Sequence, residues 1–228
     1  MIICDKPKFL FIHVEKVAGQ SISEALMPVA ATSLQKLASR FIPYRRQLQA
    51  LTLVARTLHL HTAPKSYRDH IPAQQLRDIL GGDYSTYFSF AFVRNPWNWV
   101  YSQYTYTMHN KRHRNHNSVQ KLGSFTAFCE WLTKQTTIYD QSHYVTDNNG
   151  KIIVDFIGRY ERLPSDFHSV CDKLGIRASL PHSNKSDAAP NPWPHSPETI
   201  ALIGSHFKRD VELFGYEPPE PNDQQITT

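Results

Sequence analysis

Two short apolar runs, each followed by a turn and then by a helical pattern, constrain the fold of this chain most. Residues 8–14 (KFLFIHV) and 88–93 (FSFAFV) have the length of strands and are rich in β-branched and aromatic side chains. A near-continuous apolar run is typical of a strand covered on both faces of a parallel sheet. Alternation of such strands with helices predicts an α/β domain of three layers, with a central parallel sheet and helices on both faces.

The rest of the chain is mostly helical in its periodicity. We expect the first helix to begin at Ser21 or Ser23, and another to have Pro72 in its first turn, Leu76 and Ile79 on its inner face and Gly81 at its end. Further helices are predicted within 33–58, after Pro96, and over 123–134, 164–176 and 197–214, with a hairpin turning at 148–150 and a polar surface loop over 109–118. Residues 1–216 are predicted to form one domain and 217–228 a disordered tail.

Composition excludes several classes of protein. The three cysteines (Cys4, Cys129 and Cys171) are widely spaced and odd in number, so a disulfide framework or a zinc site is not expected. The chain has neither the ~18 consecutive apolar residues of a membrane span nor the pattern of a signal peptide, so we expect a cytoplasmic protein. Lys and Arg number 25 against 20 Asp and Glu, and this small excess does not imply a nucleic-acid partner.

The turn after the first apolar run has the residues of an anion site. Lys16 supplies a cation, Ala18 and Gly19 allow a close approach of the backbone, and Gln20 and Ser21 open the next helix. Free N–H groups and the helix dipole favour an anion there. The lysine precedes the glycine, so this is not the glycine-rich loop of nucleoside triphosphatases. Taken alone, the turn is equally well explained as an ordinary solvated loop.

The turn after the second run is similar in character. Arg94 follows the strand, and Ser102 lies eight residues further on, a little over two helical turns. A guanidinium group and a hydroxyl group at that spacing can bind one phosphate. Two anion sites at neighbouring strand ends suggest a nucleotide with two separated phosphate groups.

Both turns resemble a known family. FIHVEKVAGQSI is similar to the 5′-phosphosulfate loop, and FAFVRNPWNWVYSQY to the 3′-phosphate segment, of sulfotransferases that use 3′-phosphoadenosine 5′-phosphosulfate (PAPS). The resemblance is to the carbohydrate branch, which includes the uronyl and heparan sulfate 2-O-sulfotransferases. HTAPKSYRDHIPAQQLRDIL, VDFIGRYERLPSDFHSVCDKLGI, LPHSNKS and RDVELFGY follow in the same order, so most of residues 8–216 is covered.

The resemblance implies a P-loop-like fold, PAPS as donor and the bisphosphate PAP as product, with no metal. It implies that the first turn contacts the 5′-phosphosulfate through Lys16, Ala18, Gly19, Gln20 and Ser21. It also implies that Arg94 and Ser102 contact the 3′-phosphate, and that Arg159, Ser183, Asn184 and Lys185 close over the nucleotide. The sequence departs from the family pattern at Glu15, where proline is usual, at Val17, where a hydroxyl residue is usual, and at Trp99, which often is arginine. These departures bear on donor affinity.

The transfer of a sulfuryl group to a hydroxyl group also needs a base. We favour His61, because the resemblance puts a histidine directly before TAPKSYRDH and because imidazole has a suitable pKa. His59 is the second choice, while Lys16 fits the stabilisation of the leaving group. His13, on an apolar strand, is interpreted as structural.

The acceptor is the open question. We expect a small molecule or a glycan. It would be anionic if the basic cluster at His109, His113 and His116 contacts it. The other interpretations of that cluster are a solvated loop and, less well supported, a metal site. Two other functions stay open. One is a kinase-like phosphotransferase, although Asp155, inside a predicted strand, is poorly placed for magnesium; the other is a non-catalytic domain that binds polyanions. The sequence does not indicate an oligomeric state.

Overall fold

The sheet has four strands in the order β1-β2-β3-β4. The computed structural model describes residues 1–30, 70–135, 138–181 and 195–221. The strands are β1 (Ile2–Asp5), β2 (Lys8–Ile12), β3 (Phe88–Val93) and β4 (Phe156–Arg159). β2, β3 and β4 are parallel, as predicted, but β1 is antiparallel to β2, so the sheet is mixed. Only two residues connect β1 to β2, and so short a connection can join only antiparallel strands.

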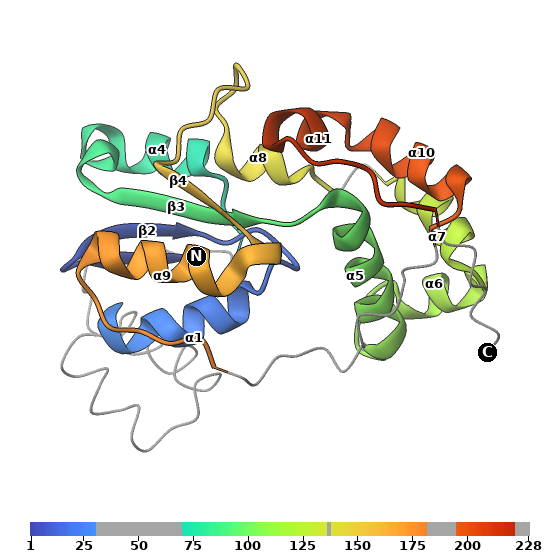
Figure 1. The fold of residues 1–228 in the computed structure, drawn as a ribbon, viewed down its shortest axis with the longest axis horizontal. Coiled ribbons are helices and arrows are strands. Elements are labelled where there is room, and N and C mark those ends of the chain that lie inside the picture. The colour runs from blue at the N-terminus through green and yellow to red at the C-terminus, as the bar shows by residue number, and fades with distance from the viewer. Residues whose placement is uncertain (31–69, 136–137, 182–194, 222–228) are drawn as a thin grey trace.

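Helices cover both faces of this sheet, which confirms the predicted α/β architecture (Figure 1). The helices α1 (Gly19–Ala30) and α9 (Leu163–Leu174) lie on one face, and α4 (Ala73–Leu80) and α8 (Gln141–Val145) lie on the other. A short 3₁₀ turn at Gly81–Thr86 precedes β3, and another at Tyr160–Arg162 follows β4. No helix within the described ranges is long and apolar enough to cross a bilayer.

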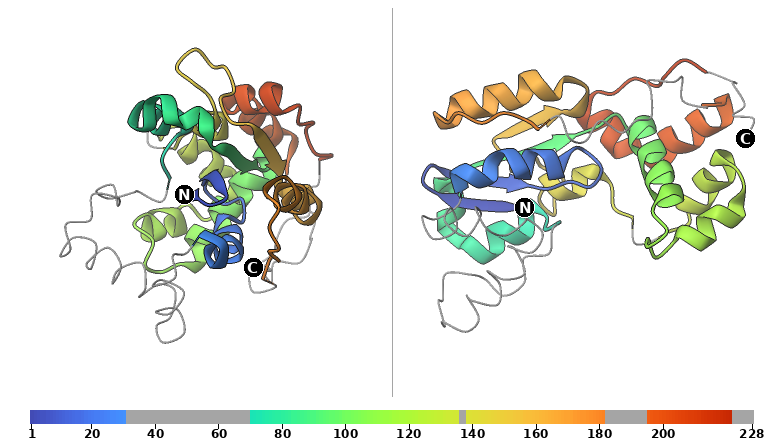
Figure 2. Two further views of the ribbon diagram at one scale, coloured as in Figure 1. Left: turned by 90° about the vertical axis from the view of Figure 1, so that its left-hand side faces the viewer. Right: turned by 90° about the horizontal axis from the view of Figure 1, so that it is seen from below.

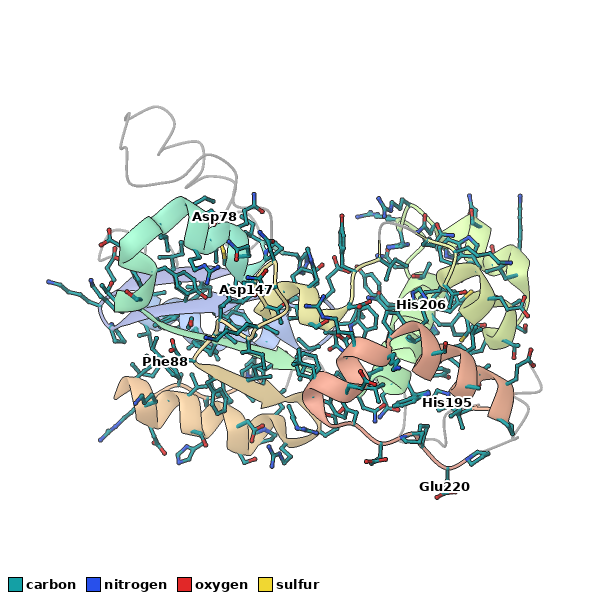
Figure 3. All side chains as sticks on the ribbon, turned by 90° about the horizontal axis from the view of Figure 1, so that it is seen from above. Asp78, Phe88, Asp147, His195, His206 and Glu220 are labelled. Carbon is teal, nitrogen blue, oxygen red and sulfur yellow. The ribbon has the colours of Figure 1, made fainter. Side chains whose placement is uncertain are left out.

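A second group of helices lies beyond the carboxyl end of β3 (Figure 2). It consists of α5 (Pro96–His109), α6 (His116–Leu122), α7 (Phe125–Leu132) and α10 (Pro197–His206), and α11 (Lys208–Phe214) packs back against α8. Figure 3 labels Phe88, at the start of β3, and His195, before α10, near opposite ends of the molecule. The end of β3 therefore lies between the sheet and these helices.

Side chains of β2 and β3 form the centre of the core. Phe9, Phe11, Phe90 and Phe92 have no exposed surface, as their near-continuous apolar runs predict. Full burial of one such side chain contributes about 1.5–3 kcal/mol. In β4, a Cβ atom at Gly158 would lie 2.4 Å from the Phe92 ring, so only glycine lets the two strands pair at this point.

Several predicted boundaries are wrong. Helix α1 begins at Gly19, which places Ser21 and Ser23 inside the helix and buried. Gly81 ends α4 as predicted. Pro72 directly precedes the first residue of α4 and does not lie in its first turn. Ile79, which was predicted on the inner face, is 53% exposed. The inner face of α4 continues from Leu76 to Leu80, four residues on, where Leu80 packs against the core.

In two further segments the secondary structure differs from the prediction because of contacts with distant parts of the chain. The first arm of the predicted hairpin is helix α8, and only a Thr146–Ile152 bridge flanks the turn at 148–150. Asp155 lies just before β4 rather than inside a strand. The predicted helix over 197–214 is divided at Phe207, whose side chain is fully buried against Trp99.

The polar surface loop predicted over 109–118 is also partly helical. Helix α6 begins at His116, which is buried and whose Nδ1 lies 3.0 Å from the Thr107 carbonyl oxygen. Burial of this imidazole against α5 fixes the start of α6. Residues 217–221 carry no helix or strand.

Candidate active site

The turn between β2 and α1 has an unusual backbone. Lys16 and Ala18 have φ angles of 60° and 62°, in the left-handed region that residues other than glycine rarely occupy. Each such residue costs of order 1 kcal/mol, and such strain is concentrated where backbone groups face a ligand. Helix α1 begins at once after Ala18, so the turn lies at the amino end of the helix, where the dipole favours an anion.

Gly19 is required at the start of α1 by the side chain of His13. A Cβ atom at position 19 would lie 1.8 Å from His13 Nε2. The His13 ring packs against Phe11 and lies 4.4 Å from the ring of His70. Burial, the N-terminal amino group and His70 lower the pKa of His13 to about 3. This neutral, packed imidazole supports the structural role expected of His13.

Trp99 also holds this turn. Its Nε1 donates a hydrogen bond of 2.7 Å to the carbonyl oxygen of Glu15, and its ring is buried against Phe207. The tryptophan that replaces an expected arginine is therefore an anchor for the turn. Val17 is fully buried, so an apolar side chain suits that position. The carboxylate of Glu15 lies 3.9 Å from His70 Nε2.

Arg94 lies at the end of β3, next to this turn. Its side chain is buried, Nη1 makes a long hydrogen bond of 3.5 Å to the Lys16 carbonyl oxygen, and the guanidinium carbon lies 4.1 Å from the centre of the Tyr160 ring. Gln141 fixes the backbone, because its side chain accepts from Arg94 N at 2.8 Å and donates to Arg94 O at 2.7 Å. The two predicted anion-binding turns are thus in direct contact.

Lys16 and Arg94 bring two positive charges to this junction. Lys16 Nζ lies 3.8 Å from the centre of the Tyr106 ring. Burial, followed by the charge of Arg94, lowers the pKa of Lys16 to about 8. Burial also lowers the pKa of Arg94. An anion bound between them would relieve both effects, since it would replace lost hydration and offset the mutual repulsion.

Ser102 lies on the face of α5 that points toward Lys16. It precedes Tyr106 by four residues, so the two side chains lie on one side of the helix, one turn apart. Asn95 caps the same helix by accepting from the N–H groups of Trp97 and Asn98. This cap sets the direction in which α5, and with it Ser102, leaves the Arg94 turn.

Arg159, at the end of β4, occupies a neighbouring position. Its N–H donates to Asp166, and its guanidinium group donates to the Phe214 carbonyl oxygen and lies 4.6 Å from the Tyr216 ring centre. An open cleft of about 330 Å³ lies here, and its lining residues are Asn95, Asn98, Arg159, Glu161, Arg162 and Tyr216. Arg159 therefore borders a cleft beside the Arg94 turn rather than joining the Lys16–Arg94 pair.

The remaining predicted site residues divide into two groups. Gln20 is exposed in the first turn of α1, and Ser21 behind it is buried. His59, His61, Ser183, Asn184 and Lys185 lie outside the described residues. Their roles stay predictions.

The sequence did not predict how several residues shape the site. Tyr106 and Tyr160 place rings against the two cations, and Gln141 holds the Arg94 backbone. Asp210 is fully buried and accepts from the N–H groups of Gln141 and Ser142 at 2.7 and 2.8 Å; burial raises its pKa to about 6. The sequence offered one signal for Asp210. A carboxylate inside a predicted amphipathic helix is a candidate for burial with hydrogen-bond donors from another segment.

The histidine cluster after α5 is spread over different environments. His116 is buried, whereas His113 packs edge-on against Tyr106 with ring centres 5.8 Å apart. Within the described ranges, no group of three His, Cys, Asp or Glu side chains is arranged to hold a metal ion.

Comparison with known proteins agrees with this geometry. Residues 1–217 match the sulfotransferase family. The chain belongs to that family. An uncharacterized protein of Archaeoglobus fulgidus is 36% identical to this sulfotransferase over 115 residues, which are 48% of this chain and 87% of that protein. The family assignment made from the two turns is confirmed, and sulfuryl transfer is the general chemistry of the sulfotransferase.

Proposed function

We propose that this sulfotransferase moves a sulfuryl group from PAPS to a hydroxyl group of a carbohydrate or related acceptor. The proposal depends most on one observation: Lys16, which is half-buried, and Arg94, which is buried, meet where two adjacent parallel strands end. Two cationic residues joined through one backbone carbonyl group suit a ligand with two anionic groups.

The donor set fits PAPS at both ends. Lys16 and the turn from Ala18 to Ser21 would hold the 5′-phosphosulfate, since the turn lies at the amino end of α1, where the helix dipole favours an anion. Arg94 and Ser102 would hold the 3′-phosphate. Arg159, with Ser183, Asn184 and Lys185 from the sequence, would close the nucleotide site.

The residues of the chain supply positioning and charge. PAPS, when bound, supplies an activated S–O bond that breaks as the acceptor oxygen attacks sulfur, with PAP as product. Lys16 stabilises negative charge on the leaving phosphate oxygen. Trp99 and Gln141 keep the two turns in place. Such positioning of the reacting groups contributes a large part of the rate enhancement in a group transfer. We propose His61 as the base for the acceptor proton, with His59 as the second candidate.

The kinase-like alternative gains no support from Asp155. Its carboxylate accepts hydrogen bonds from the N–H and hydroxyl groups of Ser89, near the amino end of β3. Arg94 follows the other end of that strand. The carboxylate is therefore remote from the proposed phosphate sites.

Isothermal titration calorimetry tests the donor. Adenosine 3′,5′-bisphosphate should bind more tightly than ATP, without a requirement for magnesium. Arg94→Gln should weaken that binding about 10- to 100-fold, because a hydrogen bond to a charged group contributes about 1.5–3 kcal/mol. Lys8→Met, at the far end of β2, is the matched control and should bind normally. Tighter binding of magnesium-ATP would overturn the proposal.

Transfer of labelled sulfate from PAPS tests the reaction itself. We expect a labelled product from at least one acceptor in a panel of glycosides and other alcohols. His61→Ala should lower turnover about 100-fold or more while bisphosphate binding is retained. If the bisphosphate binds but no acceptor is ever labelled, a non-catalytic polyanion-binding role replaces the enzymatic one.

A further inference from the structure

Asp210 is a buried carboxylate that is connected to Arg94 through one residue, Gln141. It belongs to α11, has no exposed surface, and accepts hydrogen bonds from the N–H groups of Gln141 and Ser142 at 2.7 and 2.8 Å. A carboxylate costs free energy in a core unless hydrogen-bond donors satisfy its oxygens. Here the donors are the first two N–H groups of α8, so the start of that helix depends on a residue from another one.

The side chain of Gln141 binds the backbone of Arg94 as an antiparallel strand would. Its carboxamide accepts from the Arg94 N–H group at 2.8 Å and donates to the Arg94 carbonyl oxygen at 2.7 Å. β3 ends at Val93, one residue earlier, and its register with β2 ends at Ala91. Gln141 thus fixes the Arg94 backbone beyond the ladder with β2, and the backbone sets the direction in which the guanidinium group points.

Helix α8 is too short to hold Gln141 by itself. It has five residues, and a helix of that length is not stable without tertiary contacts. Neighbouring residues of α11, which packs beside α8 (Figure 1), supply such contacts at both ends. Asp210 binds the first two N–H groups, and Arg209 Nη2 donates to Thr146 Oγ1 at 3.0 Å. Asp210 therefore sets the place of Gln141, while Arg209 supports the other end of the helix independently.

Two acceptor atoms are needed at position 210, and an ionised carboxylate has them. Burial raises the pKa of Asp210 to about 6, so the group is still mostly ionised near pH 7 and both oxygens accept. An asparagine has one carbonyl oxygen, and its amino group would face one of the two N–H groups. Asp210→Asn should therefore break one of the two bonds with almost no change in volume.

The Arg94 turn is also held at its next residue. The Asn95 N–H group donates to Glu161 Oε1 at 2.7 Å, and the Tyr216 hydroxyl group donates to Glu161 Oε2 at 3.2 Å. These contacts involve neither α8 nor Gln141. Loss of a bond to Asp210 should therefore displace Arg94 without releasing the whole turn.

We propose that Asp210 is a positioning residue, which sets the place of Arg94 through Gln141 and thereby the selectivity for a nucleotide with a 3′-phosphate. The inference deepens the proposed function and rests on it for the identity of the phosphate. Asp210 acts through α8 and not on the nucleotide. Gln141 and Asp210 have no exposed surface, so water cannot take over a bond that is lost between them.

Calorimetry on the full chain near pH 7 compares adenosine 3′,5′-bisphosphate with adenosine 5′-monophosphate. Asp210→Asn should weaken binding of the bisphosphate about three- to tenfold and of the monophosphate less than about twofold, because only the bisphosphate needs Arg94. Gln141→Met, which removes both bonds to the Arg94 backbone, should have the same selective effect. In an Arg94→Gln background, Asp210→Asn should add less than about twofold.

Ser89→Ala is the matched control for a general loss of stability. Ser89 is buried near the other end of β3, and its hydroxyl group donates to the Asp155 carboxylate at 2.8 Å. Its replacement should lower stability and leave the ratio of the two affinities unchanged. If Asp210→Asn weakens both nucleotides equally, or keeps its full effect in the Arg94→Gln background, Asp210 only stabilises the fold and the proposal is overturned.

Amide hydrogen exchange, measured by NMR without ligand, tests the connection apart from the donor. Relative to the Phe90 amide inside β3, the Arg94 amide should exchange about tenfold faster in Asp210→Asn, whereas the two amides should change together in Ser89→Ala. An unchanged Arg94 amide in Asp210→Asn, with preference for the bisphosphate retained, overturns this inference alone. Equal binding of the two nucleotides by the unaltered protein overturns the donor proposal instead, and the exchange rates then still decide whether Asp210 holds Arg94.

Discussion

At the scale of single residues, the cations of the site cost stability in the ligand-free protein. The lowered pKa of Lys16 means that burial and Arg94 disfavour its charged form. The left-handed backbone at Lys16 and Ala18 adds strain to the same turn. Lys16 and its turn are therefore better explained by ligand binding than by folding.

Replacement of Lys16 by methionine should separate these two effects. Lys16→Met removes the buried charge, so we expect a free energy of unfolding at pH 7 that is unchanged or higher, while affinity for adenosine 3′,5′-bisphosphate falls about 10- to 100-fold. Urea unfolding and calorimetry measure the two quantities. A variant with lower stability and normal affinity would show that Lys16 is a structural residue.

The pKa of Lys16 also predicts a pH dependence. Between about pH 8 and the ordinary value of 10.5, the unfolded chain binds more protons at Lys16 than the native protein does. The free energy of unfolding of the ligand-free protein should therefore rise with pH across that window, and the full cost is present below it. Bisphosphate binding should weaken over the same window, because Lys16 loses its charge. Lys16→Met should show neither trend, and equal trends in that variant would assign them to another group.

At the scale of elements, the start of α1 depends on a contact between Gly19 and His13. Because a Cβ atom at position 19 would overlap the imidazole, Gly19→Ala should destabilise the protein by about 1–3 kcal/mol and weaken bisphosphate binding. His13→Ala in the same chain should restore part of both losses. Denaturant unfolding of the double-mutant cycle measures this coupling.

Gly82→Ala is the matched control for this cycle. No atom lies within 4 Å of a Cβ at position 82, so its effect should be small. If His13→Ala gives no recovery in the Gly19→Ala background, the cost arises from the helix start itself and not from the imidazole.

Element boundaries show where local pattern is sufficient. The apolar runs of β2 and β3 and the glycine that ends α4 are where the sequence predicts them, because burial on both faces and a cap with a positive φ angle leave local signatures. The predicted hairpin arm is instead α8, whose first two N–H groups bond to Asp210, nearly 70 residues away. No local pattern around residue 141 contains that partner.

At the scale of the whole molecule, the site joins the sheet to the helices beyond it. Lys16 comes from the sheet side and Tyr106 from α5, while Gln141 in α8 links Arg94 to Asp210 in α11. A ligand that contacts both turns should therefore stabilise the entire fold. The same ligand should have little affinity for the unfolded chain, in which the two turns are apart.

Thermal unfolding measures this linkage. At a concentration about 100 times its dissociation constant, adenosine 3′,5′-bisphosphate should add about 2.7 kcal/mol of stability. For a chain of 228 residues this corresponds to a rise in Tm of roughly 5–10 °C. Adenosine 5′-monophosphate, which lacks the 3′-phosphate, should give a smaller rise at the same concentration. An equal rise with both nucleotides would contradict a role for Arg94 and Ser102 in holding the 3′-phosphate.

The sequence by itself determined the alternation of strands and helices, the two turns that we propose to bind anions, and the family, because apolar runs, glycine and the order of motifs can be read from the chain without its fold. Only the tertiary structure decided how those turns are held. The bonds from Trp99 to Glu15 and from Gln141 to Arg94 join residues 84 and 47 positions apart. Contacts of that separation form only when the chain folds.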